Sequence, residues 1–335
     1  MRWGTGAGAS RLISGTMTLH RRLEEQLADF TCQDASLLFG SGYLANTGTI
    51  PALAGTGEVV FSDELNHASI IDGCRLSRAE RFVYRHRDTD HLAWGLRRAR
   101  GRAALIVTDG VFSMDGDVAP LTELLGLARR YHCRLLVDEA HATGAVGPGG
   151  RGSVADAGLA SEVDVVVGTL GKALGSYGAY VCAAPEITEL LVNTARPFIF
   201  STGLPPPSVG AASAALELLA SEPERVEHLT ANAEAMRSEL RAAGLDPGAT
   251  CTQIFPIVVG EAERATALCE RALECGVFAQ AIRPPTVPPG TSRLRLTVMA
   301  THRRQELRRA ARTLAATARE LGLPAAEAGE LHEAA

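Results

Sequence analysis

Lys172 is the only lysine in a chain of 335 residues whose other Lys/Arg positions are all arginine. It lies in "VVVGTLGKALGSYG", residues 165–178, just after a run of valines. A genome that favours arginine could have left this lysine by accident. The alternative is that the position needs an amine. Arginine stays protonated and cannot form an imine, whereas a lysine can lose its proton in a suitable pocket.

A carboxylate upstream of this lysine indicates what the amine would do. Asp138 ends the apolar run "RLLV", with His141 shortly after it, and Thr169 precedes Lys172. The constellation is typical of pyridoxal phosphate (PLP) sites, where a carboxylate keeps the pyridine nitrogen protonated and a lysine holds the aldehyde as an imine. The letters "DEAH" also occur in helicases, but a helicase needs a P-loop, and the only lysine stands in "GTLGKALG".

Other polar residues at the ends of predicted strands have both a structural and a functional interpretation. In "LFGSGYLANTG" a glycine-rich junction that includes Gly42 precedes a predicted helix, and its amides suit a phosphate or an ordinary tight turn. Tyr43 could lie at the edge of a cofactor or simply pack. His67 in "SDELNHASI" could stack on an aromatic ring or be a structural histidine. The opening "WGTGAGAS" lacks the preceding strand that a dinucleotide site requires.

The elements that must position these residues alternate between apolar strands and amphipathic helices up to about residue 220. "EVVF", "RFVY", "AALIVTDG", "CRLLVDEAH", "VDVVVGTLG" and "GAYVCAA" read as strands, with helical segments such as "HRRLEEQLADF" and "PLTELLGLARRYH" between them. This alternation predicts an α/β fold with a mainly parallel sheet covered on both faces. Ligands in such sheets bind beyond the carboxyl ends of the strands, where Ser113, Asp138, His141 and Lys172 fall.

The pattern changes near residue 222, which predicts two domains. Residues 1–221 form the large α/β domain, and residues 222–325 form a smaller α+β domain with strands at "IFPIVV", "VFAQAIR" and "SRLRLTVM". The Ala/Glu-rich tail 326–335 is expected to be disordered.

Bulk composition excludes several classes of protein. The net charge of −5 gives no reason to expect nucleic acid or an anionic membrane as a partner. No apolar run approaches the roughly 18 residues that span a bilayer, and the first residues contain no apolar core of a signal peptide. Seven scattered cysteines show no metal-type spacing and indicate reduced, mostly buried thiols in a cytoplasmic protein, without a bound metal.

Taken together, these motifs resemble the α-oxoamine synthases, PLP-dependent enzymes of the type I aminotransferase fold. "GTGAGASRLISGT", "SDELNHASIIDG", "VTDGVFSMDGD", "LLVDEAHATGAVGPGGRG" and "GTLGKALG" match the family pattern in order, from about Gly4 to Leu321. The family condenses an amino acid with an acyl thioester and releases CO2. Within it, "IRPPTVPPGTSRLRLT" is most similar to the branch of biotin biosynthesis that joins L-alanine to a pimeloyl group carried on coenzyme A or on acyl carrier protein.

The resemblance implies a role for each candidate residue. Lys172 would carry the imine and move the α-proton, Asp138 would pair with the pyridine nitrogen, His67 would stack on the ring, and His141 would hydrogen-bond near the phenolic oxygen. Arg295 would bind the amino-acid carboxylate. The further cofactor positions are Gly42, Tyr43, Ser113 and Thr169. Ser201 and Thr202 would reach the phosphate of a partner subunit in a homodimer, and Thr286 would contact substrate.

One departure from the family concerns the start of the chain. Relatives normally carry several tens of residues before the glycine-rich opening, including a segment that lines the active site. The large domain is therefore expected to lack its N-terminal segment. This departure keeps open a PLP-fold protein without catalysis. A second alternative is a glycine C-acyltransferase of the same family, which would differ in its thioester and amino-acid preference.

Overall fold

The structure is a computed structural model that describes residues 4–323, and the chain divides into two compact units. One unit takes the chain up to Phe112 together with Val118–Pro223. The other takes Ser113–Asp117 and the chain from Glu224 onward. The tail expected at 326–335 lies outside the described residues.

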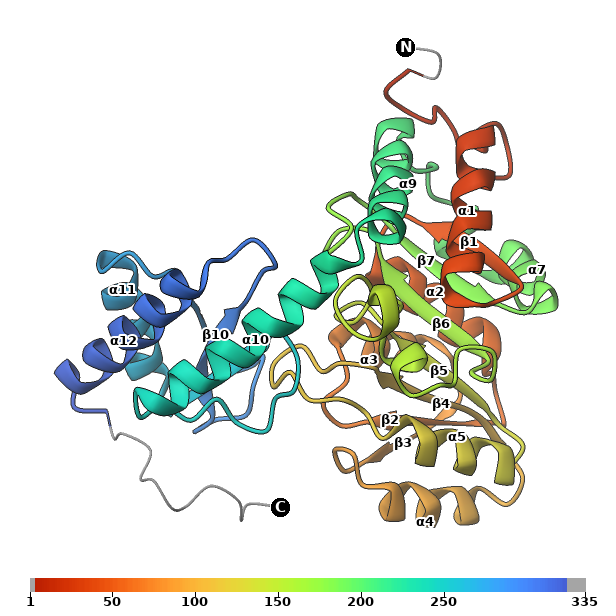
Figure 1. Cartoon of the computed structure of the whole chain (residues 1–335). Helices are drawn as coiled ribbons and strands as arrows, with labels where there is room; N and C mark the ends of the chain where they lie inside the picture. The colour runs from red at the N-terminus through yellow and green to blue at the C-terminus, as the bar shows by residue number, and fades with distance from the viewer. Residues whose placement is uncertain (1–3, 324–335) are drawn as a thin grey trace. The chain divides into compact units, whose positions relative to one another are not determined.

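The first unit is built on a seven-stranded sheet with the order β1-β7-β6-β5-β4-β2-β3 (Figure 1). All its strands run parallel except β7, which is antiparallel to both β1 and β6. This confirms the mainly parallel sheet predicted from the apolar runs. The strands are β1 (Ala35–Phe39), β2 (Val59–Asp63), β3 (Glu80–Tyr84), β4 (Ala103–Asp109), β5 (Arg134–Asp138), β6 (Val165–Thr169) and β7 (Ala179–Ala183).

Helices cover both faces of this sheet, so that each face has its own apolar core (Figure 1). In β2, Val59 and Phe61 contribute to one core and Val60 to the other, as the alternation of side chains in a strand requires. The first core is closed by α1 (Thr18–Thr31), α4 (Thr89–Ala99), α5 (Leu121–Arg130) and α9 (Pro206–Ser221). The second is closed by α2 (Gly42–Leu53), α3 (Ala68–Leu76), α7 (Pro185–Thr194) and α8 (Arg196–Ile199).

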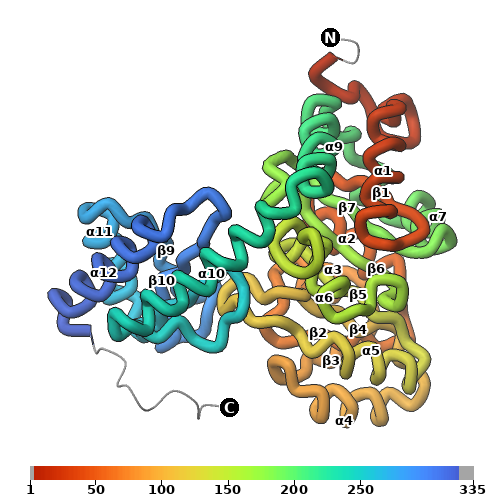
Figure 2. The backbone as a smooth tube through the Cα atoms, in the orientation of Figure 1, coloured from red at the N-terminus to blue at the C-terminus, as the bar shows by residue number. Residues whose placement is uncertain are grey.

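A glycine-rich segment with the 3₁₀ turn η1 (Pro148–Gly150) and the short helix α6 (Ser153–Asp156) connects β5 to β6. The second unit contains a three-stranded antiparallel sheet with the order β8-β10-β9 and three helices that share one core with it (Figure 2). Its elements are α10 (Glu224–Ala242), β8 (Ile254–Gly260), α11 (Ala262–Glu274), β9 (Gln280–Ile282), β10 (Ser292–Thr297) and α12 (Arg304–Glu320).

The cysteines depart from the sequence-based expectation. All seven are free thiols, but only Cys74 and Cys182 are buried, whereas Cys32, Cys251 and Cys275 are exposed. The expectation of mostly buried thiols is wrong, because the exposed ones follow helices or lie in a loop rather than on apolar faces. Among residues 4–323, no helix is both long and apolar enough to cross a membrane.

Candidate active site

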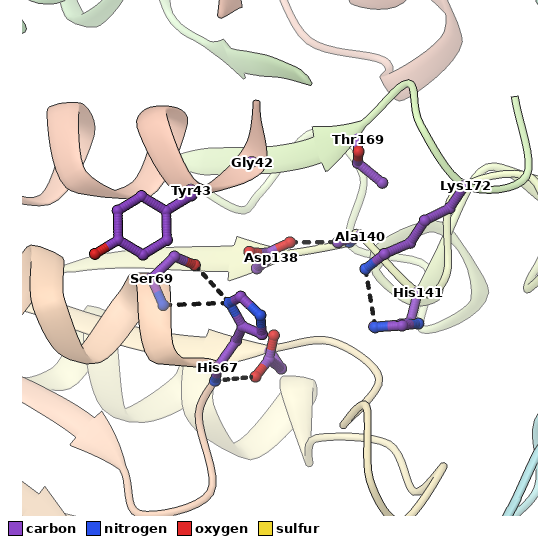
Figure 3. Close-up of a pocket in the computed structure, with 10 residues that line it drawn as sticks. Gly42, Tyr43, His67, Ser69, Asp138, Ala140, His141, Thr169 and Lys172 are labelled. Carbon is purple, nitrogen blue, oxygen red and sulfur yellow. Dashed lines mark hydrogen bonds between the residues drawn. The ribbon is translucent and has the colours of Figure 1, made fainter. Parts of the chain in front are cut away.

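A cavity of about 180 Å³ lies at the carboxyl ends of the parallel strands of the first unit. β4, β5 and β6 are neighbours in the sheet and end at Asp109, Asp138 and Thr169. These three side chains meet there because parallel neighbours end at the same edge. Figure 3 shows the lining residues, which are Gly42, Tyr43, His67, Ser69, Asp109, Asp138, Ala140, His141, Thr169 and Lys172.

Lys172 stands in a compact loop between β6 and β7. Backbone hydrogen bonds close this loop, from Gly175 N to the Lys172 carbonyl and from Ser176 N to the Leu170 carbonyl. Thr169 Oγ1 adds two more, since it accepts from Gly171 N and donates to the Gly178 carbonyl. The lysine side chain is exposed in this chain, and its Nζ lies 2.9 Å from His141 Nε2 (Figure 3).

Asp138 is 3 % exposed and accepts a hydrogen bond on each carboxylate oxygen. Ala140 N donates to Oδ1 at 2.9 Å, and Asn46 Nδ2 donates to Oδ2 at 2.6 Å. These contacts fix the carboxylate plane and stabilise its negative charge. Asp138 is thus an oriented anion at the base of the cavity.

His67 is the N-cap of α3, and its ring faces the cavity with accessible surface (Figure 3). Its backbone N donates to Asp109 Oδ2 at 2.7 Å, and its Nδ1 accepts from Ser69 N at 3.2 Å. Burial of the ring lowers the pKa of His67, with the positive charge of Lys172 acting in the same direction and Asp138 opposing it. The imidazole is therefore neutral near pH 7.

His141 lies in the tight turn that follows β5. The Glu139 carbonyl organises this turn by accepting from Ala142 N and Thr143 N. The buried Glu139 side chain accepts from Ser153 N, Ser153 Oγ and Val154 N, which attaches the turn to α6. Burial raises the pKa of Glu139 to about 7, against the opposing effect of these three donors.

Asp109 is a cavity residue that the sequence analysis missed, although it ends β4 as Asp138 ends β5. The two residues are direct partners in the register of the strands. Burial, reinforced by the negative charge of Asp138, raises the pKa of Asp109 well above its ordinary value. Burial thus favours the protonated form of the Asp109 carboxyl group.

Gly42 and Tyr43 open helix α2 beside the cavity. Ser41 caps this helix by accepting from Leu44 N at 3.2 Å, so the helix N-terminus is well formed. Tyr43 is exposed and donates its hydroxyl proton to Asp72 at 2.6 Å. That hydrogen bond raises the pKa of Tyr43 and orients its ring.

The chemistry of this donor set fits the predicted PLP. The cavity offers one amine, one oriented carboxylate, one neutral flat imidazole and the N-terminus of a 12-residue helix. These groups suit an aldehyde, a ring nitrogen, an aromatic face and a phosphate, respectively. Within residues 4–323 no cluster of His, Cys, Asp and Glu has the arrangement of a metal site.

Two predicted site residues belong to the second unit. Arg295 on β10 donates from Nε to the Ser113 carbonyl at 2.5 Å and from Nη1 to Thr297 at 3.3 Å. Burial lowers the pKa of Arg295, and no carboxylate of the described residues pairs with it. Thr286 is exposed between β9 and β10. A partly buried guanidinium without an anion is a place for a carboxylate ligand.

Ser201 and Thr202 lie outside the cavity of Figure 3, in a separate crevice of the first unit that Arg11 also lines. Thr202 forms an isolated β-bridge with Ser10, so the segment after α8 is joined to the start of the chain. Thr202 is exposed and Ser201 partly so.

Comparison with known proteins gives concordant similarities. The family described as aminotransferase class I and II matches residues 3–314. A protein of Geobacter sulfurreducens named 8-amino-7-oxononanoate synthase is 54% identical over 325 residues, covering 96% of this chain and 83% of the relative. A relative of the same name from Symbiobacterium thermophilum is 48% identical, with 96% and 82% covered.

Solved structures agree with these sequence matches. A serine palmitoyltransferase from S. paucimobilis with bound PLP–myriocin superposes with a TM-score of 0.92 at 35% identity, covering 96% of this chain and 81% of that one. A crystal structure of 8-amino-7-oxononanoate synthase from Francisella tularensis gives a TM-score of 0.80 at 27% identity, with 92% and 89% covered.

Proposed function

Because the chain belongs to the family of class I and II aminotransferases, we propose that it is a PLP-dependent 8-amino-7-oxononanoate synthase that acts in biotin biosynthesis in the cytoplasm. Its substrates are L-alanine and a pimeloyl thioester of coenzyme A or acyl carrier protein. The thioester bond breaks with release of the thiol, a carbon–carbon bond forms at the alanine α-carbon, and the alanine carboxyl group leaves as CO2.

The observation that carries this proposal is the meeting of Lys172 and Asp138 in one cavity beside the neutral ring of His67. PLP supplies the electron sink that stabilises negative charge on the alanine α-carbon. Lys172 is the only lysine that could hold it through an imine. Asp138 binds the ring nitrogen, and the His67 ring covers the aromatic face.

The chain's own acid–base group is the Lys172 amine, which accepts and returns the α-proton of alanine. His141 Nε2 lies 2.9 Å from Nζ, within hydrogen-bond distance, so the imidazole orients the amine. His141 also contacts the phenolic oxygen of the cofactor. Gly42 and Tyr43 at the start of α2, and Thr169 at the end of β6, contact the phosphate and ring.

Arg295 binds the carboxylate of L-alanine, with Thr286 as a further substrate contact. In support, Nε is engaged by the Ser113 carbonyl, which orients the guanidinium plane, and no protein carboxylate of the described residues competes for its charge. A planar fork of N–H donors binds a carboxylate through two parallel hydrogen bonds. Ser113 in turn faces the cofactor.

The enzyme is a homodimer in which Ser201 and Thr202 bind the phosphate of the partner's cofactor. Support comes from the exposure of Thr202 and from the position of both residues outside the cavity of their own chain. The crevice they line offers hydroxyl groups that can donate to an anion, whereas the Arg11 guanidinium there is already paired with Glu24.

The test is thiol release by the purified chain supplied with PLP, L-alanine and pimeloyl-CoA or the pimeloyl carrier protein. We expect release that depends on L-alanine and on the pimeloyl group, and none from the Lys172→Arg variant. A preference for glycine and acetyl-CoA would instead identify a glycine C-acyltransferase. Binding of PLP without thiol release from any pair would identify a protein without this catalysis.

A further inference from the structure

Asn46 and Ser69 connect Asp138 to His67 through hydrogen bonds beside the cavity. Asn46, in the interior of α2, is fully buried, and its Nδ2 donates to Asp138 Oδ2 at 2.6 Å and to Ser69 Oγ at 2.9 Å. Ser69 Oγ lies 2.7 Å from His67 Nδ1. These contacts form a continuous series of hydrogen bonds from the carboxylate to the imidazole, which we call the Asn46–Ser69 relay.

The direction of each hydrogen bond in the relay is fixed by its two ends. The Asp138 carboxylate can only accept, so the amide of Asn46 must face it with its NH₂ group, not with its oxygen. The second N–H of that group then donates to Ser69 Oγ. The hydroxyl proton of Ser69 is left to donate to His67 Nδ1.

The backbone of α3 leads independently to the same state of His67. Ser69 N donates to Nδ1 at 3.2 Å, and a backbone N–H cannot accept. Two donors therefore converge on Nδ1, which cannot carry a proton. The ring proton belongs on Nε2, the only ring nitrogen with which His67 can donate to a ligand.

The relay is kept at a cost to stability. The Oδ1 atom of Asn46 is buried and has no hydrogen-bond partner among the described residues. An unpaired buried acceptor destabilises a fold. An amide at this position is therefore explained by what its two N–H groups do and not by packing.

We propose that Asn46 and Ser69 are positioning residues that hold His67 as the neutral Nε2–H tautomer, so that the charge of Asp138 remains available to the ring nitrogen of the cofactor. The consequence for the cofactor rests on the proposed function, whereas the tautomer does not. A charged His67 would share the negative charge of Asp138. The ionisable groups facing His67 are Asp138, Lys172 and Asp109. Because the two donors of Ser69 occupy Nδ1, the relay keeps this ring nitrogen from being protonated.

The first test needs no reaction. The full chain, labelled with ¹⁵N in histidine, is studied at neutral pH by long-range ¹H–¹⁵N correlation, with and without PLP. His67 is assigned by the signal lost in His67→Asn, since asparagine also caps helices well. We expect an unprotonated Nδ1 and a protonated Nε2. A proton on Nδ1, whether in a charged ring, the other tautomer or an even mixture, would overturn the proposal.

The second test breaks the relay at each member. Asn46→Ala removes both amide donors, and Ser69→Ala removes the hydroxyl but keeps the backbone N–H. In both variants we expect the Nδ1 resonance to move toward its protonated position. Ser77→Ala is the matched control, because it removes another buried hydroxyl from the end of the same helix, one that donates to the Cys74 carbonyl and accepts from Ala79 N but does not contact His67. Unchanged His67 signals in a folded relay variant would refute the proposal that the relay sets the tautomer of His67. If Asn46→Ala does not fold, Ser69→Ala alone makes this test.

The third test links the relay to turnover. In the PLP-loaded enzyme we expect kcat to fall about tenfold to a hundredfold in both relay variants, with a smaller change in the KM for L-alanine. A changed tautomer with unaltered kcat would overturn the functional part of the proposal. If the unaltered chain shows no turnover at all, the proposed function fails, while the two spectroscopic tests still decide the tautomer.

Discussion

The cavity contains two adjacent carboxyl groups with different surroundings. Asp138 has an N–H donor on each oxygen, whereas burial and the charge of Asp138 raise the pKa of Asp109 well above the ordinary range. Asp109→Asn replaces a carboxyl group whose neutral form is favoured by burial with a neutral amide, and we expect activity within about tenfold of the original. Asp138→Asn removes the anion, and we expect a loss of about 10²–10³-fold in kcat. Equal losses in steady-state assays of the two variants would contradict this assignment.

The same pair makes stability depend on pH with a defined sign. Above pH 3.8 the folded chain keeps the proton of Asp109 longer than the unfolded chain does. This group therefore contributes stability at low pH that is lost as the pH rises through its folded pKa. Chemical denaturation of Asp109→Asn and of the original chain should be measured over a pH series. As the pH rises, the free energy of unfolding should fall less in the variant than in the original chain.

Arg295 allows a test of carboxylate recognition. Arg295→Ala should raise the KM for L-alanine about tenfold to a hundredfold, as expected for loss of charge-assisted hydrogen bonds. The visible absorbance of bound PLP should not change. Arg308→Ala is a suitable control in the same unit, because it breaks only a surface ion pair with Glu239. Loss of PLP absorbance in Arg295→Ala would show that this residue holds the cofactor instead.

At the scale of the elements, the glycine-rich segment after β5 packs closely against the Glu139 side chain. Gly152 has φ +105°, and a Cβ there would lie 2.8 Å from the Glu139 carboxyl carbon. Gly149 has φ +59° and open space around it. We expect Gly152→Ala to lower the free energy of unfolding by about 3 kcal/mol and Gly149→Ala by about 1 kcal/mol. Urea denaturation measures both, and similar losses would contradict the close contact with Glu139.

Helix α1 contains a buried histidine, His20. His20 Nδ1 accepts from Met17 N, and Nε2 lies 2.9 Å from the Leu204 carbonyl. Burial lowers the pKa of His20 below 6.5. As the pH falls, His20 is therefore protonated in the unfolded chain before it is protonated in the folded chain. Stability should therefore fall as the pH drops below 6.5. His20→Gln should flatten this part of the stability curve in thermal melts, while His228→Gln, at an exposed position of α10, should leave its slope unchanged.

The elements also show what the sequence could and could not predict. The apolar runs predicted the strands and a mainly parallel sheet. The strand-end rule placed Ser113, Asp138, His141 and Lys172 together, and of these Asp138, His141 and Lys172 line one cavity, whereas Ser113 belongs to the second unit. The family resemblance is confirmed by relatives that match 96% of the chain. The relay was not predictable, because it depends on how the interiors of α2 and α3 pack. Asp109 was within reach of the strand-end rule and was overlooked.

At the scale of the whole molecule, the chain is divided more finely than one boundary near residue 222 would suggest. Ser113–Asp117 belongs to the second unit, although its neighbours in sequence belong to the first. Thr250 and Thr252 each donate a hydroxyl proton to the Gly116 carbonyl, and the buried Arg293 pairs with Asp115. Nothing in the composition of these five residues marks them as part of the second unit.

The Arg293–Asp115 pair should therefore stabilise more than an ordinary surface pair. Asp115→Asn leaves a buried guanidinium without its anion, and we expect the free energy of unfolding to fall by about 1–3 kcal/mol, since Asp115 is partly exposed. Glu239→Gln, which breaks the exposed pair with Arg308, should cost at most about 0.5 kcal/mol. Chemical denaturation of the two variants makes the comparison, and equal costs would mean that the pentapeptide is held by its backbone alone.

The pentapeptide makes the second unit discontinuous in the gene. A reading frame that starts at the codon for Glu224 encodes α10 and the small sheet without the acceptors that Thr250, Thr252 and Arg293 use. Recombination between two relatives at that codon would produce a chimera. Its Ser113–Asp117 segment would come from one parent, and the β8-β10-β9 sheet that it contacts would come from the other. Asp115 and Arg293 are therefore expected to be inherited together, although more than half the length of the coding sequence separates them.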